Sequence, residues 1–303
     1  MEVTGVAKRR IAPADVCCTD LCLHSAQRLL TTLNWKRESV DALVFVTQTP
    51  DYLQPGNSSL AHRDLDLSAN CAAFDLNLGC SGYPYGLAVA AHLVAAGTAK
   101  RALVLHGETP TKVVNPDDRS TALLFGDAGS ATALEYREGA EPSGFMMHSD
   151  GTGYSDLIVS GIGFRNSKPT HDQDRYLAMN GTNIFNFTLK RVPKLALDSA
   201  RLMQWPIESI DYYVLHQANL FIIQHLAKKL KIPMTRIPLT LREFGNTGGA
   251  SVPLTLAHHF DAATIDQPTR VAMLGFGIGL SWGAALMTLD QSVAFECSEL
   301  EGT

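Results

Sequence analysis

The segment DLNLGCSGYPYG, residues 75–86, places a cysteine where it could act as a nucleophile. An apolar strand pattern leads directly into a Gly-Cys-Ser-Gly turn, and a helical pattern follows. Cys80 is therefore expected at the start of a helix, where the positive end of the helix dipole favours a thiolate. The flanking glycines let a substrate approach the backbone closely. We interpret Cys80 as a nucleophile rather than as a cysteine packed in the core.

Two further polar residues stand at positions that suit a catalytic site. In VLHQAN, residues 214–219, His216 ends a buried strand, and ligands of α/β sheets bind beyond the carboxyl ends of strands. In EFGNTGGASVP, residues 243–253, Asn246 could cap a helix and could also donate a hydrogen bond to a carbonyl that becomes anionic. The run GFGIGLSWG, residues 275–283, lacks the spacing of a dinucleotide-binding fingerprint. Its glycine-rich bend suits a backbone amide that points at an oxyanion.

The chain contains an internal repeat. At an offset of 170, NWKRESVDALVFV (34–46) aligns with QWPIESIDYYVLH (204–216). At an offset of 166, the Gly-rich turn at Cys80 aligns with the turn at Asn246, and these two residues fall opposite each other. Repeated segments in the same order predict two similar halves. If a twofold axis relates the halves, Cys80 and Asn246 can face each other in one site.

The elements that must position these residues alternate between helices and strands, which indicates α/β layers. The small-residue helix near 86–97 is typical of a helix covered on all sides, so we expect layers in the order α-β-α-β-α. We expect an N-terminal half over 1–140 and a C-terminal half over 141–303. The pattern predicts helices over 20–33, 82–96, 184–203, 221–230 and 250–260, and strands over 41–47, 73–78, 102–105, 212–215 and 237–241, with further strands within 122–134 and 271–289.

Composition excludes several classes of protein. Of the 303 residues, 46% are hydrophobic and 18% are charged, so the chain can build a large core and disorder is not expected. A net charge of −5 argues against nucleic acid or an anionic membrane as the main partner. No apolar run reaches the length of a membrane span, and the opening MEVTGVAKRR has no secretory signal. Six cysteines without a CxxC pair fit neither a disulfide scaffold nor a zinc ribbon, so we expect a cytoplasmic protein with reduced thiols.

Other titratable residues are interpreted more simply. The cysteine cluster 17–22 has no histidine ligands in metal spacing, which favours packing over a metal site. The pair Lys228–Lys229 fits a solvated helix face, although a basic patch could also receive an acidic carrier. Among the histidines we expect hydrogen-bonded core residues at His92, His106 and His225, and helix-surface residues at His258 and His259.

Taken together, four motifs resemble the β-ketoacyl-acyl carrier protein synthase III family of the thiolase fold. They are GCSGYPYGLA, HQANLFIIQHLAKKL, FGNTGGASVPLTL and GFGIGLSWG, and the similarity runs from residues 4–12 to the last strand. The resemblance implies a five-layered α-β-α-β-α sandwich built from two duplicated halves. It also implies a catalytic triad of Cys80, His216 and Asn246. The backbone amides of Cys80 and Ile278 would form the oxyanion hole.

The reaction implied by the resemblance is a decarboxylative Claisen condensation. An acyl thioester such as acyl-CoA would load Cys80, and malonyl-acyl carrier protein would then lose carbon dioxide and attack the acyl group. Neither a metal nor a redox cofactor is implied, and a homodimer is expected. Two other functions stay open. One is a cysteine acyltransferase or hydrolase without condensation, and the other is a non-catalytic partner subunit, against which the intact triad argues.

The sequence departs from the family pattern in several places. Relatives carry an additional leading strand before the segment that matches residues 4–12, so either the start of the sequence is shortened or this strand is absent. Arg119 matches a family arginine that contacts the coenzyme A nucleotide. The resemblance also assigns Asn219 and Phe185 to substrate binding. Phe221 replaces an arginine that contacts the carrier in relatives. Gln54 stands where relatives place a bulky residue that reaches into the partner's acyl pocket, which predicts a medium-chain acyl donor.

Overall fold

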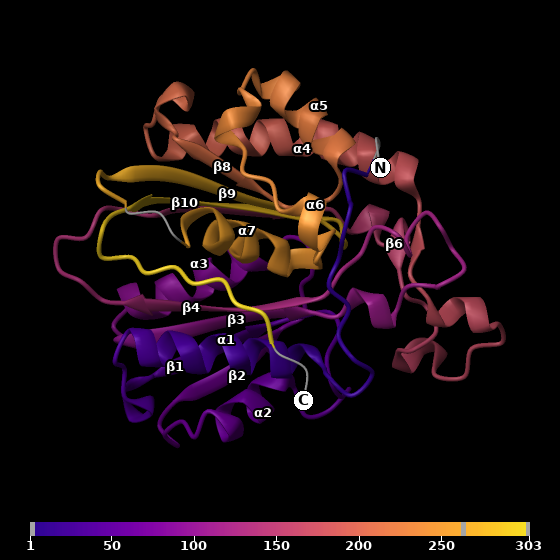
Figure 1. Ribbon diagram of the computed structural model, residues 1–303, viewed down its shortest axis with the longest axis horizontal. Helices are drawn as coiled ribbons and strands as arrows, with labels where there is room; N and C mark the ends of the chain where they lie inside the picture. Colours follow the sequence, from indigo (N-terminus) through magenta and orange to yellow (C-terminus); the bar gives the residue numbers. More distant parts are fainter. Residues whose placement is uncertain (1–3, 262–264, 301–303) are drawn as a thin grey trace.

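The computed structural model describes residues 4–261 and 265–300 and arranges their helices and strands in five layers (Figure 1). Helices form both outer layers and the central one: α1 (Cys18–Thr32) and α2 (Asn57–Asp64) on one side, α4 (Gly181–Leu202) and α5 (Leu220–Leu230) on the other, and α3 (Gly82–Ala95) and α7 (Ser251–Phe260) between the sheets. Two β-sheets separate these helical layers. The predicted α-β-α-β-α sandwich is confirmed.

Each main sheet combines parallel and antiparallel strands. In the first, β1 (Ala42–Val46) pairs in parallel with β2 (Ala72–Leu76) and β3 (Arg101–Glu108), and β3 pairs antiparallel with β4 (Ala128–Glu135). In the second, β9 (Thr269–Gly277) pairs in parallel with β8 (Tyr212–Leu215) and antiparallel with β10 (Ser281–Leu289), which pairs with β5 (Gly144–Ser149). The strand orders are β2-β1-β3-β4 and β5-β10-β9-β8.

The inner strands of both sheets are covered on two faces, which explains their continuous apolar sequences. All five residues of β1, the run ALVFV, are buried. Strands in sheets with both faces covered read as unbroken apolar runs rather than alternating ones. Val46 at the end of β1 lies opposite His106 of β3, so the carboxyl ends of these parallel strands reach the same edge of the sheet.

The small residues of α3 let this helix lie close to both sheets. A methyl group on Gly86 would come within 2.8 Å of Val46 and 3.0 Å of Val104, so only glycine fits this contact. On the other side, Gly283 of β10 would bring a methyl group within 3.0 Å of Tyr85. The central layer is thus tightly packed, which fixes the start of α3 relative to both sheets.

The predicted repeat has a matching structure in the two halves. Trp35 stacks on the Arg101 guanidinium, whose carbon lies 4.6 Å from the ring centroid, and Arg270 lies 4.9 Å from the Trp205 ring in the same way. Arg101 donates to Ser39 and Arg270 donates to Ser209, each at 2.9 Å. The sequence repeat relates these residues: the two tryptophans and the two serines are 170 positions apart, and the two arginines are 169 apart. The duplication therefore extends to individual side-chain contacts.

One predicted strand is wrong. Residues 237–240 form no strand, and the short helix α6 (Leu241–Phe244) follows them. The side chain of Gln217 lies against this segment: its amide donates to the Pro238 carbonyl at 3.4 Å, and its oxygen accepts the Thr240 N–H at 3.2 Å. A buried side chain therefore provides the hydrogen bonds that a neighbouring strand would otherwise supply.

Several elements were not predicted. Besides α2 and α6, they are the edge strand β5 and the two-residue strands β6 (Leu157–Ile158) and β7 (Ala178–Met179), which pair with each other. These elements are short, and α2 is mostly polar in sequence, NSSLAHRD. Short elements without apolar periodicity leave little signal in a single sequence.

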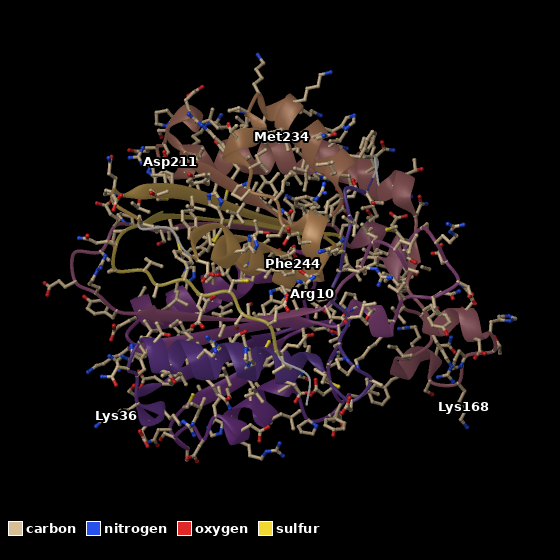
Figure 2. All side chains as sticks on the ribbon, viewed as in Figure 1. Arg10, Lys36, Lys168, Asp211, Met234 and Phe244 are labelled. Atoms are coloured by element: carbon tan, nitrogen blue, oxygen red, sulfur yellow. The ribbon has the colours of Figure 1, made fainter. Side chains whose placement is uncertain are left out.

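The two ends of the described chain run across the layers. Near the beginning, Leu220 donates to the Thr4 carbonyl, and Arg10 lies 5.2 Å from the Phe244 ring centroid (Figure 2). At the other end, the segment after β10 crosses towards α1, where Arg28 pairs with Glu296. Within the described residues, β5 flanks β10 but no strand flanks the equivalent edge of β4. The division into halves at residue 140 stays a prediction.

Among the described residues, no helix is both long enough and apolar enough to cross a lipid bilayer.

Candidate active site

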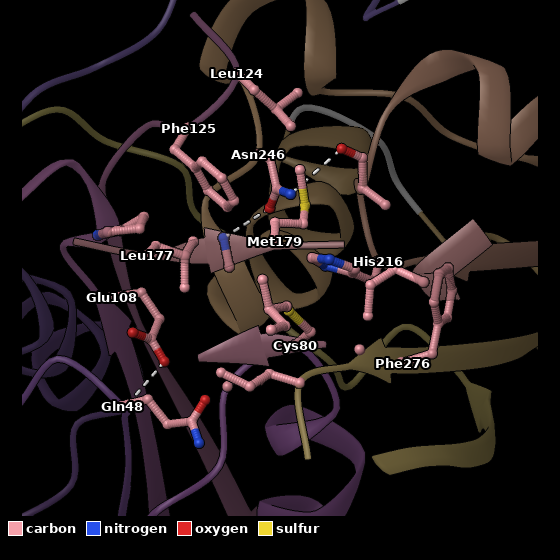
Figure 3. Close-up of a pocket in the computed structure, with 18 of the residues that line it drawn as sticks. Gln48, Cys80, Glu108, Leu124, Phe125, Leu177, Met179, His216, Asn246 and Phe276 are labelled. Carbon is pink, nitrogen blue, oxygen red and sulfur yellow. Dashed lines mark hydrogen bonds between the residues drawn. The ribbon is translucent and has the colours of Figure 1, made fainter. Parts of the chain in front are cut away.

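The three side chains singled out from the sequence line one cavity (Figure 3). Cys80 lies just before α3, His216 follows β8, and Asn246 lies between α6 and α7. The cavity measures about 170 Å³. The repeat argument, which placed Cys80 and Asn246 together, therefore matches the geometry.

The two glycine-rich turns face each other directly. A methyl group on Gly249 would collide with the Gly79 carbonyl oxygen and with the His106 ring. Backbone pairing holds the second turn, since Asn246 donates to the Leu124 carbonyl at 2.9 Å and accepts from Gly126 at 3.0 Å. This close backbone contact requires glycine and sets the separation between the start of α3 and the start of α7.

The Cys80 thiol is enclosed by backbone. A methyl group on Gly277, whose φ is +156°, would come within 2.8 Å of the Cys80 sulfur. Burial raises the pKa of Cys80 to about 11, and hydrogen bonds from the Ile278 and Cys80 backbone lower it in part. The expectation that the helix start favours a thiolate is therefore wrong for the unloaded site, because desolvation outweighs it.

His216 is fixed by Ser251, the first residue of α7. The Nδ1 atom of His216 lies 2.8 Å from the Ser251 hydroxyl, which also accepts the Gln217 N–H at 3.1 Å. A hydroxyl has one proton and two lone pairs, so Ser251 can accept the Gln217 N–H and also donate to Nδ1, an arrangement that places the histidine proton on Nε2. Burial lowers the pKa of His216 to about 4, so the ring is neutral at physiological pH.

The Asn246 amide has a defined orientation. Its oxygen accepts the Gly248 N–H at 3.0 Å, and its nitrogen donates to the Ala218 carbonyl at 3.3 Å. An amide nitrogen carries two protons, so one remains available for a ligand. His216 and Asn246 can thus both donate to an acceptor in the cavity.

The rest of the cavity is mainly apolar. Its wall near β6 and β7 is built by side chains from these strands and from the segment between β3 and β4. Such a lining suits an acyl chain or another apolar group. The apolar residues are Pro110, Val113, Leu124, Phe125, Leu157, Val159, Leu177, Met179, Ile184, Ala218, Ile222, Phe276 and Ile278.

The remaining predicted site residues lie in different places. Ile278 and Asn219 line the cavity, and the Asn219 side chain also caps α5 by accepting the Ile222 N–H at 2.8 Å. Phe185 lies outside the lining and packs against the Phe221 and His225 rings. Arg119 is exposed.

Gln54 is exposed on the loop between β1 and α2 and does not line this cavity. Its predicted role concerns the pocket of a partner subunit.

Comparison with known proteins identifies the family to which the chain belongs. The family model described as 3-oxoacyl-[acyl-carrier-protein] synthase III matches residues 74–151, which include Cys80. The model of the C-terminal part of the same enzymes matches residues 201–289, which include His216 and Asn246. The chain belongs to this family. The resemblance inferred from the four motifs is confirmed.

Relatives of the synthase III family match nearly the whole chain. A β-ketoacyl-[acyl-carrier-protein] synthase III from Streptomyces coelicolor is 35% identical over 291 residues, which cover 94% of this chain and 87% of the relative. The crystal structure of a 3-oxoacyl-(acyl-carrier protein) synthase from Burkholderia xenovorans has a TM-score of 0.93 and 40% identity, covering 97% of this chain and 86% of that one. A synthase III from Thermus thermophilus has a TM-score of 0.88 and 35% identity, covering 96% and 90%.

Several polar residues at this site were not predicted. Ser251 contacts His216, and Gln48, Thr49, Glu108 and Thr188 line the cavity. Glu108 ends β3, and the rule that singled out His216 at the end of a strand could have found it. The interpretation of His106 as a hydrogen-bonded core residue is wrong, because both of its buried ring nitrogens lack a partner.

Proposed function

We propose that this chain is a 3-oxoacyl-[acyl-carrier-protein] synthase III that acts in fatty acid or related lipid biosynthesis. It would condense an acyl thioester with malonyl-acyl carrier protein through an acyl-Cys80 intermediate. The observation that carries the proposal is the single cavity lined by Cys80, His216, Asn246 and apolar side chains. Relatives with this name, similar over 94% of the chain, support the same reaction.

In the first stage, the Cys80 sulfur attacks the carbonyl carbon of the acyl thioester. The carbon–sulfur bond to the carrier thiol breaks, and acyl-Cys80 and a free carrier thiol result. The backbone N–H groups of Cys80 and Ile278 would hold the carbonyl oxygen as it becomes anionic. Their hydrogen bonds to the Cys80 sulfur, which lower its pKa in part, support this assignment. One such donor contributes roughly 3–4 kcal/mol to the barrier reduction.

In the second stage, the malonyl thioester loses carbon dioxide and forms an enolate. Nε2–H of His216 and the free amide proton of Asn246 would donate to the thioester carbonyl and stabilise the developing charge. The contacts of His216 with Ser251 and of Asn246 with Gly248 support these donor roles. The new carbanion attacks acyl-Cys80, the bond to sulfur breaks, and a 3-oxoacyl thioester leaves on the carrier. No step needs a metal or a redox cofactor.

The substrates and partners follow from this reaction. Acyl-CoA is the proposed donor, with Arg119, Asn219 and Phe185 as contacts for its carrier portion, and acyl carrier protein is the proposed protein partner. Lys228 and Lys229 near the end of α5 are candidates for docking the acidic carrier, although the Lys229 amine also donates to the Leu189 carbonyl at 2.7 Å. No nucleic acid enters the proposal.

We further propose a cytoplasmic homodimer. All six cysteines are free thiols, as is usual for proteins of a reducing compartment. In the first sheet, β2 is an edge strand, and the neighbouring loop exposes 60% of Tyr52 and 63% of Leu53. An exposed strand edge beside apolar side chains is typical of a surface that another chain covers.

The proposed reaction is tested by following labelled carbon dioxide from malonyl-acyl carrier protein. Release is expected only when an acyl donor is present, together with one acyl adduct on the protein by mass spectrometry. Cys80→Ala should lose both signals, whereas the matched variant Cys297→Ala should keep them. An adduct without carbon dioxide release would indicate an acyltransferase or hydrolase instead. Absence of any adduct would indicate a non-catalytic subunit.

A further inference from the structure

Two of the polar side chains that line the cavity, Gln48 and Glu108, have no part in the proposed reaction. Gln48 stands two positions after β1 and Glu108 ends β3, so both lie where parallel strands end. Glu108 is 3% exposed, and Gln48 is half-buried. In a mainly apolar cavity, a few polar groups of this kind determine which ligand binds and how it is oriented.

The Gln48 side chain lies against the turn that carries the nucleophile. A methyl group on Gly79, the residue directly before Cys80, would come within 2.5 Å of Gln48 Oε1. The same methyl group would come within 3.0 Å of the Ile278 side chain, which also lines the cavity. The Gln48 amide therefore contacts the chain immediately before Cys80, in the cavity that holds the sulfur.

The amide of Gln48 has unused hydrogen-bonding capacity. Its backbone N–H donates to Glu108 Oε1 at 3.0 Å, but its side chain makes no hydrogen bond with another residue in the described part of the chain (Figure 3). The other Glu108 oxygen accepts the Thr49 hydroxyl at 2.9 Å. Each carboxylate oxygen keeps a further lone pair. Two neighbouring side chains thus offer acceptors to a ligand in the cavity, and the amide also offers donors.

These two side chains lie on the side of Cys80 away from His216 (Figure 3). In the proposed second stage, His216 and Asn246 bind the malonyl thioester. The side with Gln48 is then left for the acyl group on the sulfur. Because the amide packs against the residue next to Cys80, a substituent that meets it would stand on one of the first carbons of the acyl chain.

We infer that Gln48, with Glu108 beside it, is a specificity-determining residue that selects acyl donors with a hydroxyl group close to the thioester. This inference rests on the proposed acyl-Cys80 intermediate. A hydroxyl can donate to the Glu108 carboxylate or to Gln48 Oε1, and it can accept from the Gln48 NH2 group. It therefore fits the pair whichever way round the amide stands. An unsubstituted alkyl chain would cover the amide without giving it a partner, which disfavours binding.

The experiment compares two donors of equal chain length, octanoyl-CoA and 3-hydroxyoctanoyl-CoA, on the full-length protein. Single-turnover acylation of Cys80 is followed by intact mass spectrometry. The wild type should react at least about 10-fold faster with the hydroxylated donor, because a site with hydrogen-bonding groups rejects a substrate that leaves them unpaired. Gln48→Met keeps the length of the side chain and removes the amide. It should slow acylation by the hydroxylated donor about 10-fold or more and should speed up acylation by octanoyl-CoA.

Two controls accompany this variant. Gln27→Met, on the exposed side of α1, should keep the donor preference of the wild type. Alkylation of Cys80 by iodoacetamide, a reagent without an acyl chain, measures whether the sulfur of Gln48→Met stays reactive.

Equal acylation of the wild type by the two donors, or faster acylation by octanoyl-CoA, would overturn the inference and leave the proposed function intact. A preference for the hydroxylated donor that persists in Gln48→Met would also overturn it. Equal slowing of both donors and of alkylation in that variant would do the same, because a collapsed site explains it. A wild type that forms no Cys80 adduct with either donor would contradict the proposed function, and the inference with it.

Discussion

At the scale of single residues, a neighbouring group orients each of the two hydrogen-bond donors of the cavity, His216 and Asn246. Ser251 accepts from the Gln217 N–H and can donate its own proton to His216 Nδ1, an arrangement that places the histidine proton on Nε2. The Gly248 N–H holds the Asn246 oxygen and turns its NH2 group towards acceptors. The two donors are therefore oriented before a substrate arrives, and preorganised donors stabilise charge more effectively than mobile ones.

These orientations predict a division of labour between the two stages. His216→Ala and Asn246→Ala should still acquire an acyl group on Cys80, because their hydrogen bonds are needed only when the malonyl thioester loses carbon dioxide. Each variant should lose condensation by about 100-fold to 1,000-fold. The measurement pairs acyl-adduct formation with carbon dioxide release from malonyl-acyl carrier protein. A loss of acylation as severe as in Cys80→Ala would contradict the assignment.

Burial of His216 also predicts a pH-dependent stability. Its pKa is lowered from 6.5 to about 4 in the folded chain, so below pH 6.5 the unfolded chain binds the proton and the folded chain does not. The free energy of unfolding therefore falls as the pH falls through this window. Between pH 6.5 and pH 5 the contribution is about 2 kcal/mol, at 1.36 kcal/mol per pH unit.

This pH effect is isolated by comparing the wild type with His216→Asn in urea. The difference between their free energies of unfolding should shift by about 2 kcal/mol in favour of the variant when the pH drops from 6.5 to 5. Other titratable groups are common to both proteins and cancel. A difference that does not change with pH would show that His216 is not held neutral by burial.

At the scale of elements, the site depends on the contact between the two glycine-rich turns. Gly249→Ala would force a methyl group into the Gly79 carbonyl and the His106 ring, neither of which can move freely in the central layer. Overpacking of this kind typically costs about 1–3 kcal/mol. We expect a lower free energy of unfolding in urea and a lower condensation rate. Gly163→Ala is the matched control, because no atom lies within 4 Å of the added methyl group; equal stability of the two variants would contradict the contact.

The sequence predicts the helices and strands that have a local pattern of apolar residues. It does not predict a segment whose structure is determined by contacts with a distant part of the chain. The helix at Gly82 and the strand at Ala42 follow from apolar periodicity and composition. Residues 237–240 have the composition of a strand, but the buried side chain of Gln217 binds their backbone instead. A side chain from another part of the chain leaves no trace in the local pattern.

The same distinction applies to the site. Cys80 and Asn246 could be paired because the repeat relates their turns, and His216 could be found from its strand end. Ser251 carries no such signal, because its hydrogen bond to His216 depends on how α7 packs beneath β8. The pKa of Cys80 could not be predicted either, since the helix start argues for a low value and only the packed site reveals the burial that raises it.

At the scale of the whole molecule, the first sheet has an edge strand that lies beside a loop with exposed apolar side chains. Among the described residues no strand pairs with the outer side of the edge strand β2, and the loop beside it exposes Tyr52 and Leu53. We predict a homodimer joined through β2, the strand after Asn70, with an interface in the obligate range of roughly 2,000 Å² or more. Light scattering at micromolar concentration should give the mass of two chains. Leu53→Asp should weaken the dimer, whereas Leu197→Asp, also an exposed leucine, should not; a monomeric wild type would refute the prediction.

The proposed dimer also leads to a prediction about the length of the acyl donor. Gln54 is exposed on the loop after β1 and does not line the cavity of its own chain. This position is compatible with a residue that reaches into the pocket of a partner subunit. A flexible glutamine closes a pocket less tightly than a bulky ring, and each additional buried methylene contributes about 0.8 kcal/mol. Four more methylenes would favour a longer donor by about two orders of magnitude. We therefore expect faster turnover with donors of about six to ten carbons than with acetyl-CoA. Gln54→Phe should shift the preference towards short donors without changing iodoacetamide alkylation of Cys80. Faster turnover of the wild type with acetyl than with octanoyl donors would contradict the proposed role of Gln54 in closing the partner's pocket.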